Sequence, residues 1–358
     1  MSKDNLYIKR NKGLGGKSKT IILVSILILS IALVVFLGIL VFGSGDDGEG
    51  KTIGKLFSSD KNGTSSNEKG NNGNSTEEPE ATQEPYAPIV EDAVTVGTRF
   101  NPPEGYERVE LEEGSFGEYL RNYALKPYGT VAFLYDESTG SYVENTEAST
   151  VGVFQQPNDL NRWQQCADSI AMLYAEYLYE NQQYDKITFT FSNGFVCDWL
   201  TYAQGNRFDL NTSSWVMKAE PDDSYETFQR YLDLVYQFLN TDSLQKDMSV
   251  TPAAGDIAVG DAFVVGVSQL SAAVAAVDPG ATVSYGHAII VVDVAVNENG
   301  EKIFMIAEGN TPATEIAIIE NSDPEMGVWF KFNDVGSFVK NSETGVPWSA
   351  AWLRRFPE

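Results

Sequence analysis

The strongest feature of the hydrophobic pattern is an unbroken apolar run near the N-terminus. It extends over residues 21–43, which are 23 residues without a charge. At about 1.5 Å per residue, a helix of this length covers the roughly 30 Å hydrocarbon core of a bilayer. A buried soluble helix and a cleaved signal peptide are the alternatives, but the run is longer than the apolar part of a signal peptide and no small-x-small cleavage site is evident. We therefore expect a single transmembrane helix at residues 21–43.

The flanking segments give this helix an orientation. Residues 1–20 carry six basic residues and one acid, so the positive-inside rule predicts a cytoplasmic tail and an extracellular C-terminal part. Residues 44–95 are rich in Gly, Ser, Asn, Glu, Thr and Pro. Such a segment buries too little apolar surface to offset its conformational entropy, which predicts a disordered linker. Aromatic and aliphatic residues then recur without a repeat, so we expect one extracytoplasmic domain over residues 96–358.

Helical periodicity marks three segments of this domain. Ser115 followed by Glu118 is a capping box that opens a short helix. Apolar residues at steps of three and four predict a helix of about 20 residues. They are Leu160, Trp163, Ala167, Ile170, Tyr174 and Tyr177. A similar stripe from Tyr225 to Leu239 predicts another helix, with Asp223 as its cap.

Short runs rich in β-branched and aromatic residues predict strands. They cover residues 130–135, 186–191, 260–266, 288–296 and 302–309. The last two runs are joined by NENGE, whose Asn299-Gly300 pair suits a two-residue type I′ turn. Helices in the first half and an antiparallel sheet in the C-terminal third define an α+β domain.

The composition of the chain excludes several classes of function. The chain has 50 acids against 25 bases, a net charge of −25, whereas a nucleic-acid surface requires clustered Lys and Arg. We therefore expect no nucleic-acid partner. One histidine and two cysteines cannot complete a zinc site without carboxylates, and no GxSxG motif supports a serine hydrolase. We expect neither a metal nor a cofactor, and what remains is chemistry of a cysteine and a histidine.

Cys166 in NRWQQCADSIAML and His287 at the start of the strand GHAIIVV are the candidate pair. A thiol attacks as thiolate, and an imidazole can accept its proton and return it to a leaving amine. A third polar group must orient the ring, and the return strand supplies Glu308 and Asn310. With a tight turn, Glu308 pairs with Val291, on the face of His287 but about 13 Å along the ladder. Strand twist, a bulge or a shifted register must close that gap.

Each of these residues also has a simpler interpretation. Cys166 and Cys197 can form a disulfide in an extracytoplasmic domain, and a lone helical cysteine can be a small core residue. A lone histidine at the start of a strand can be an ordinary polar group with its hydrogen bonds made. If the helix begins at Asn158 or Asp159, Cys166 lies about two turns inside it and gains little from the helix dipole.

The order of these residues resembles papain-like cysteine peptidases, in which a helix-borne cysteine precedes a strand beginning with His-Ala and a return strand ending in a polar residue. Residues 99 to about 356 also resemble the bacterial family catalogued as domain of unknown function 4846. The matching motifs are RFNPPEGYERV, SFGEYLRNYALKP, QQCADSIAMLYAEYLY, FSNGF, GDAFV and GHAIIVVDVA. The family resemblance implies that Cys166 in QQCAD and His287 in GHA are the matching site residues. The third site residue of the family is usually Gln within AQS, whereas this chain has Ala307-Glu308-Gly309.

We therefore expect a membrane-anchored, papain-like cysteine hydrolase or acyltransferase acting on an amide bond of a peptide or cell-wall peptide. Cys166 would attack, His287 would shuttle the proton and Glu308 would orient the ring. Gln164 or Gln165 would donate to the oxyanion, and the spacing does not choose between them. The candidate binding residues are Trp163, Gln165, Trp199, Arg207 and Asn310. The alternative is a non-catalytic extracellular binding or sensing module on the same scaffold.

Overall fold

A computed structural model describes residues 87–333, 336–340 and 346–357 of the chain. The predicted transmembrane helix and most of the predicted linker lie outside these residues. Within them, no helix has the length and apolar character needed to cross a bilayer. Residues 87–95, predicted to belong to the linker, make backbone contacts with the domain, since the Val90 N–H donates to the Arg99 carbonyl at 2.8 Å and the Asn101 N–H to the Pro88 carbonyl at 3.0 Å. The folded part of the chain therefore begins earlier than the predicted boundary.

The described residues contain the three helices that the periodicity predicted and four others. They are α2 (Val96–Arg99), α3 (Phe116–Arg121), α4 (Cys166–Glu180), α5 (Trp199–Ala203), α6 (Tyr225–Phe238), α7 (Thr241–Asp247) and α8 (Val267–Val277). The predicted cap of α3 is confirmed, because the Ser115 hydroxyl accepts the Glu118 N–H at 3.2 Å. The predicted cap of α6 is wrong, because the hydroxyl that accepts the Thr227 N–H belongs to Ser224.

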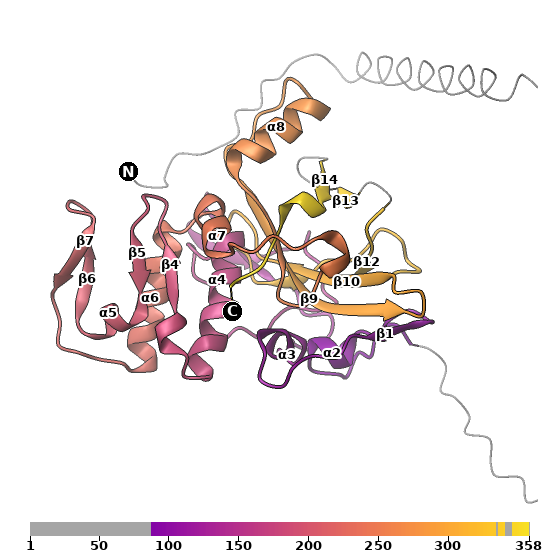
Figure 1. Cartoon of the computed structure of the whole chain (residues 1–358), viewed down its shortest axis with the longest axis horizontal. Coiled ribbons are helices and arrows are strands. Elements are labelled where there is room, and N and C mark those ends of the chain that lie inside the picture. The colour runs from indigo at the N-terminus through magenta and orange to yellow at the C-terminus, as the bar shows by residue number, and fades with distance from the viewer. Residues whose placement is uncertain (1–86, 334–335, 341–345, 358) are drawn as a thin grey trace, which may run out of the picture. The chain divides into compact units, whose positions relative to one another are not determined.

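The strands form one large antiparallel sheet and four hairpins. The sheet has the order β11-β10-β9-β8-β15, with β1 paired to β9 and β12 to β10. Its strands are β1 (Tyr106–Arg108), β8 (Ala262–Val265), β9 (His287–Asn297), β10 (Lys302–Glu308), β11 (Ala317–Ile318), β12 (Trp329–Phe330) and β15 (Leu353–Arg354). The hairpin strands are β2 (Phe133–Asp136), β3 (Ser141–Glu144), β4 (Thr188–Thr190), β5 (Val196–Asp198), β6 (Asn206–Asp209), β7 (Ser214–Met217), β13 (Ser337–Lys340) and β14 (Pro347–Ser349). Figure 1 shows α5, α6 and the hairpins β4–β5 and β6–β7 on one side of α4 and the large sheet on the other, which is the predicted α+β class.

Strand β9 separates two hydrophobic clusters. Its side chains alternate, so that Ala288 and Ile290 face a cluster that includes α4, whereas Ile289 and Val291 face a second cluster that includes Trp348. Both faces of the strand are buried, which explains why its sequence is almost continuously apolar. The sheet therefore holds α4 on one face, and the start of β9 lies at the boundary between the two clusters.

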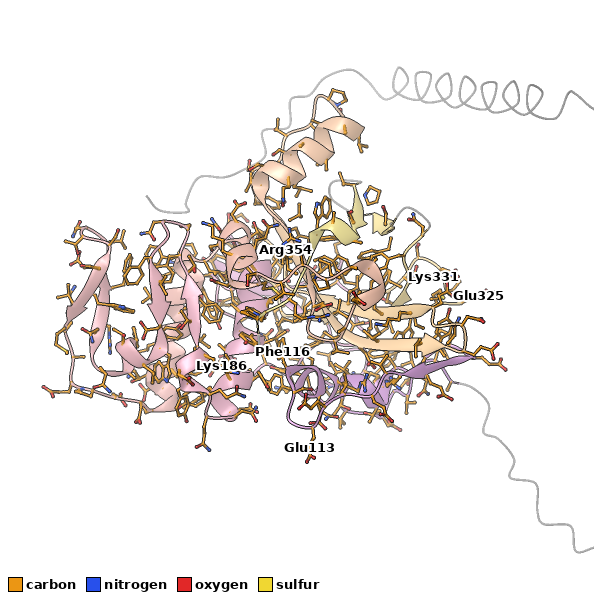
Figure 2. The ribbon with its side chains drawn as sticks, in the orientation of Figure 1. Glu113, Phe116, Lys186, Glu325, Lys331 and Arg354 are labelled. Carbon is orange, nitrogen blue, oxygen red and sulfur yellow. The ribbon has the colours of Figure 1, made fainter. Side chains whose placement is uncertain are left out.

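Aromatic rings join α3 to α4. The Phe116 ring centroid lies 5.2 Å from that of Tyr174 and 5.3 Å from that of Tyr177. Figure 2 shows Phe116 beside Lys186 in the lower part of the domain, with Glu113 below them. These three labelled residues border a cavity of about 610 Å³ that Cys166 does not line.

The turn between β9 and β10 differs from the prediction and sets the register of the two strands. The Gly300 N–H donates to the Asn297 carbonyl at 2.9 Å, and Gly300 has a φ of 79°. The loop thus has three residues closed by a left-handed glycine, not the two of a type I′ turn. The pairing starts at Lys302 with Val296 and shifts again at a bulge after Met305.

The bulge brings the end of β10 closer to the start of β9. Beyond it, Ile306 pairs with Val291 and Ala307 with Ile290, so by continuation Glu308 is opposite Ile289. Glu308 is then two residues along the ladder from His287 instead of the predicted four, or roughly 7 Å. Both side chains keep the same face of the sheet, because the register has shifted by an even number of residues.

Candidate active site

Cys166 is the first residue of α4. The preceding residue, Gln165, has an extended backbone, and its N–H donates to the Asp168 carboxylate at 3.0 Å. The prediction that the helix begins near Leu160 is wrong, because the side chain of Asn161 accepts the Trp163 N–H at 2.9 Å and holds the segment in a turn. The first N–H groups of a helix have no acceptor within the helix, and its dipole favours negative charge there. The thiol is therefore at the positive end of the α4 dipole.

His287 is the first residue of β9, as predicted, and Glu308 is the last residue of β10. The His287 Nε2 and a Glu308 carboxylate oxygen are 2.7 Å apart. The Trp348 ring lies against the imidazole, with 5.5 Å between the ring centroids. Both His287 and Trp348 are buried. No sequence motif marked Trp348, which lies far along the chain, so the wall beside the histidine could not be predicted.

The charge on the imidazole depends on Cys166. Burial lowers the pKa of His287, but the charge of Cys166, a hydrogen bond with its side chain, and the hydrogen bond and charge of Glu308 raise it. The net result is a His287 pKa well above its usual value of 6.5. Because Glu308 occupies Nε2, the nitrogen that remains for the thiol is Nδ1. The fold therefore brings Cys166, His287 and Glu308 into one chain of contacts.

A cavity of about 560 Å³ opens beside the thiol. Cys166 lines it although the residue as a whole is only 4 % exposed, so the thiol is buried yet borders open space. The walls come from the loop before α4, the hairpin β2–β3, the connection between α6 and α7, and the segment before β9. Trp163 and Gln165, both predicted to bind substrate, are among the lining residues.

Two glycines allow the elements of the site to approach closely. A Cβ at Gly286 would lie 2.2 Å from the Val265 carbonyl oxygen and 2.3 Å from the Thr241 hydroxyl. A Cβ at Gly309 would lie 2.3 Å from the Ser169 hydroxyl of α4. Side chains at these positions would push apart the elements that carry His287, Glu308 and Cys166.

The two neighbouring glutamines point to different cavities. Gln165 lines the cavity of Cys166, whereas Gln164 lines a separate polar cavity of about 60 Å³. The Gln164 Nε2 is buried and makes no hydrogen bond with any described residue. The structure therefore favours Gln165 over Gln164 as the side chain nearer the thiol.

Asn310 does not contact the imidazole. Its side-chain oxygen accepts the Thr311 N–H at 2.8 Å, and the residue lines, together with Glu308, a cavity that Cys166 does not line. Of the two candidates on the return strand, Glu308 is thus the one in contact with the ring.

Two other predicted binding residues lie away from the cavity. Trp199 is 1 % exposed and packs in the core with its ring centroid 5.7 Å from that of Tyr231. The Arg207 guanidinium lies 3.9 Å from the Tyr202 ring centroid and donates to the Tyr202 carbonyl at 2.9 Å. Neither residue lines the cavity of Cys166. Their place in the fold corrects the prediction, since aromatic and basic residue types alone do not distinguish a core contact from a cleft.

The disulfide alternative is excluded, because both cysteines are free. Cys197 is fully buried in β5, and burial raises the pKa of its thiol well above the usual value. A buried, neutral thiol of this kind is chemically inert. In the described ranges, no group of three or more His, Cys, Asp and Glu side chains is placed to hold a metal ion.

The structure is thus an α+β domain that places a helix-borne thiol beside an imidazole and a carboxylate. The chain belongs to the family described as domain of unknown function (4846), whose family model matches residues 96–345. That range includes Cys166, His287 and Glu308. No curated protein and no solved structure matches the chain.

Proposed function

We propose that the protein is a membrane-anchored, extracytoplasmic cysteine hydrolase or acyltransferase of papain-like type, acting on an amide bond of a peptide or cell-wall peptide. The observation that carries the proposal is the contact of Cys166, at the start of α4, with an imidazole whose other nitrogen is 2.7 Å from Glu308. The anchor is inferred from the apolar run at residues 21–43.

The proposed reaction starts from a thiolate and an imidazolium. The Cys166 sulfur attacks the amide carbonyl carbon and forms a C–S bond, while the oxyanion accepts hydrogen bonds from the Cys166 N–H and from the Gln165 side chain. His287 gives its Nδ1 proton to the amide nitrogen as the C–N bond breaks, which leaves a thioester and a free amine. Water or a second amine then attacks the thioester, its proton passes to His287, and the C–S bond breaks.

Glu308 is a positioning residue in this mechanism. Its carboxylate fixes the orientation of the ring and stabilises the imidazolium with a negative charge, which an amide at the same position would not provide. Trp348 covers the ring, and removal of water strengthens the attraction between the two charges. These contacts favour the ion pair over the neutral thiol and imidazole.

The proposal is tested by treating the full-length protein with iodoacetamide at pH 7 and locating the modified cysteine by peptide mapping. We expect Cys166 to react about tenfold faster than free cysteine, because an ordinary thiol is only about 3 % ionised at this pH. Cys197 serves as the internal control and should stay unmodified. Labelling of Cys166 no faster than free cysteine would instead support the non-catalytic binding or sensing module.

A further inference from the structure

Arg162 differs from the other described arginines in having no acceptor for its side chain. Among residues 87–333, 336–340 and 346–357, every other arginine donates to a carboxylate, a hydroxyl or a backbone carbonyl. These arginines are Arg99, Arg108, Arg121, Arg207, Arg230, Arg354 and Arg355. Arg162 is exposed, in a chain whose net charge is −25.

The guanidinium of Arg162 is nevertheless held in place. Its central carbon lies 4.6 Å from the Trp163 ring centroid, a stacking contact that restricts the side chain. The loop that carries it is tied to α6, because the Asn161 side-chain amide donates to the Asp233 carboxylate at 2.6 Å and the Asn158 side-chain amide to the side-chain oxygen of Gln229 at 2.6 Å. Because the fold already restricts the Arg162 side chain, a ligand that binds it would remove less conformational entropy from that side chain.

Arg162 lies where the cavity of Cys166 meets a second hollow. It lines the cavity that contains the thiol and also an adjoining open groove of about 440 Å³. Glu137 and Asp168 line the thiol cavity as well, and the Asp168 carboxylate accepts the Gln165 N–H at 3.0 Å. The positive charge is thus directed to space that a substrate bound at Cys166 would also occupy.

We propose that Arg162 binds a carboxylate of the substrate, so that the preferred substrate is a peptide with an acidic side chain or a free C-terminal carboxylate close to the amide that reacts. The planar fork of a guanidinium matches a carboxylate with two parallel hydrogen bonds, and an amide cannot replace that match. This inference rests on the proposed function and names the substrate class of the same site.

The test compares thiol reagents that differ only in one charge. The full-length protein is alkylated with N-iodoacetyl-glycine and N-iodoacetyl-triglycine, each as the free acid and as the amide, and with N-iodoacetyl-aspartate amide against N-iodoacetyl-asparagine amide. We expect the acid to react with Cys166 about tenfold faster than its neutral partner for at least one pair. The glycine reagents report recognition of a terminal carboxylate, and the aspartate pair reports recognition of a side-chain carboxylate.

The ratio of the labelling rates of the acid and the amide reports on Arg162 alone, because a change in the reactivity of the thiol alters both rates equally. Arg162→Gln should bring the ratio to about 1, and Arg162→Lys should leave an intermediate value, since charge is kept but the fork is lost. Arg230→Gln removes the same charge from α6 and should keep the ratio of the unaltered protein. A ratio near 1 in the unaltered protein, or a ratio that survives Arg162→Gln, overturns the inference.

These outcomes separate the inference from the proposed function. Rapid labelling by iodoacetamide together with a ratio near 1 would support the proposed function and overturn the inference that Arg162 selects carboxylates. If iodoacetamide labelling is slow, the proposed function fails, and calorimetry with Cys166→Ser still decides the role of Arg162. The ligands are N-acetyl-triglycine against its amide, and N-acetyl-aspartate amide against N-acetyl-asparagine amide. Equal affinity within both pairs overturns the inference.

Discussion

Replacing His287 with alanine is expected to slow the alkylation of Cys166 by iodoacetamide about tenfold at pH 7, to the rate of free cysteine. The imidazolium is the cation that would stabilise the thiolate, and the charge of Cys166 is the largest of the effects that raise the His287 pKa against the opposing effect of burial. Without the ring, the thiol should behave as an ordinary one, of which about 3 % is ionised at pH 7. The measurement is the second-order rate of labelling at Cys166.

Two controls accompany this measurement. His287→Gln keeps a hydrogen-bonding side chain of similar size but no titratable ring, so it should be slowed to the same extent. Unfolding curves of both variants show whether the domain remains folded, because His287 is buried against Trp348. A labelling rate within a factor of two of the unaltered protein, in variants that are folded, would mean that His287 does not activate Cys166.

Replacing Gly286 with alanine is expected to lower the free energy of unfolding by about 3 kcal/mol, because the added Cβ meets fixed backbone instead of a movable side chain. The nearest atom is the carbonyl oxygen of Val265, at 2.2 Å. Val265 pairs with His287 across the sheet, so relief of the clash displaces the start of β9. We therefore expect the labelling of Cys166 to slow in the same variant.

The matched control is Gly255→Ala, because a Cβ at Gly255 would have no atom within 4 Å. Urea unfolding followed by tryptophan fluorescence gives the difference between the two variants. Equal free energies of unfolding for Gly286→Ala and Gly255→Ala would show that the approach of Thr241 and Val265 to Gly286 is not required.

The sequence predicted the helices and strands better than the residues at which they begin and end. Apolar stripes located α4 and α6, and the run after His287 located β9, because burial of one or both faces leaves a periodic trace. The start of α4 was misplaced by the Leu160–Trp163–Ala167 spacing, which continues the helical period through a segment that is not helical. Hydrogen bonds of Asn161 and Asp168 decide that boundary, and such bonds leave no periodic trace.

The sequence predicted which residues form the candidate site but not the distances between them. Cys166, His287 and Glu308 were identified by residue type and order, whereas the gap between His287 and Glu308 depends on a loop of three residues and a bulge after Met305. Both features shift the register, and neither follows from residue propensity alone. Trp348 could not be predicted because nothing in its local sequence relates it to β9.

The raised pKa of His287 also makes stability depend on pH. A histidine whose pKa is higher in the folded than in the unfolded state stabilises the fold fully below about pH 6.5, its unfolded value. That contribution is lost as the pH rises through the raised value of the folded state. Titration of the ring therefore reports directly on the pairing of His287 with Cys166 and Glu308.

His287 is the only histidine in the chain, so a protein labelled with ¹⁵N in the imidazole and lacking a histidine tag gives one set of ring signals. The most direct measurement is the NMR titration of these signals in the unaltered protein, in Cys166→Ala and in Glu308→Gln. We expect a ring that is still doubly protonated well above pH 6.5 in the unaltered protein, and a midpoint that falls in both variants, because each loses a negative partner. A midpoint at or below 6.5 that Cys166→Ala leaves unchanged would contradict the ion pair on which the proposed chemistry depends.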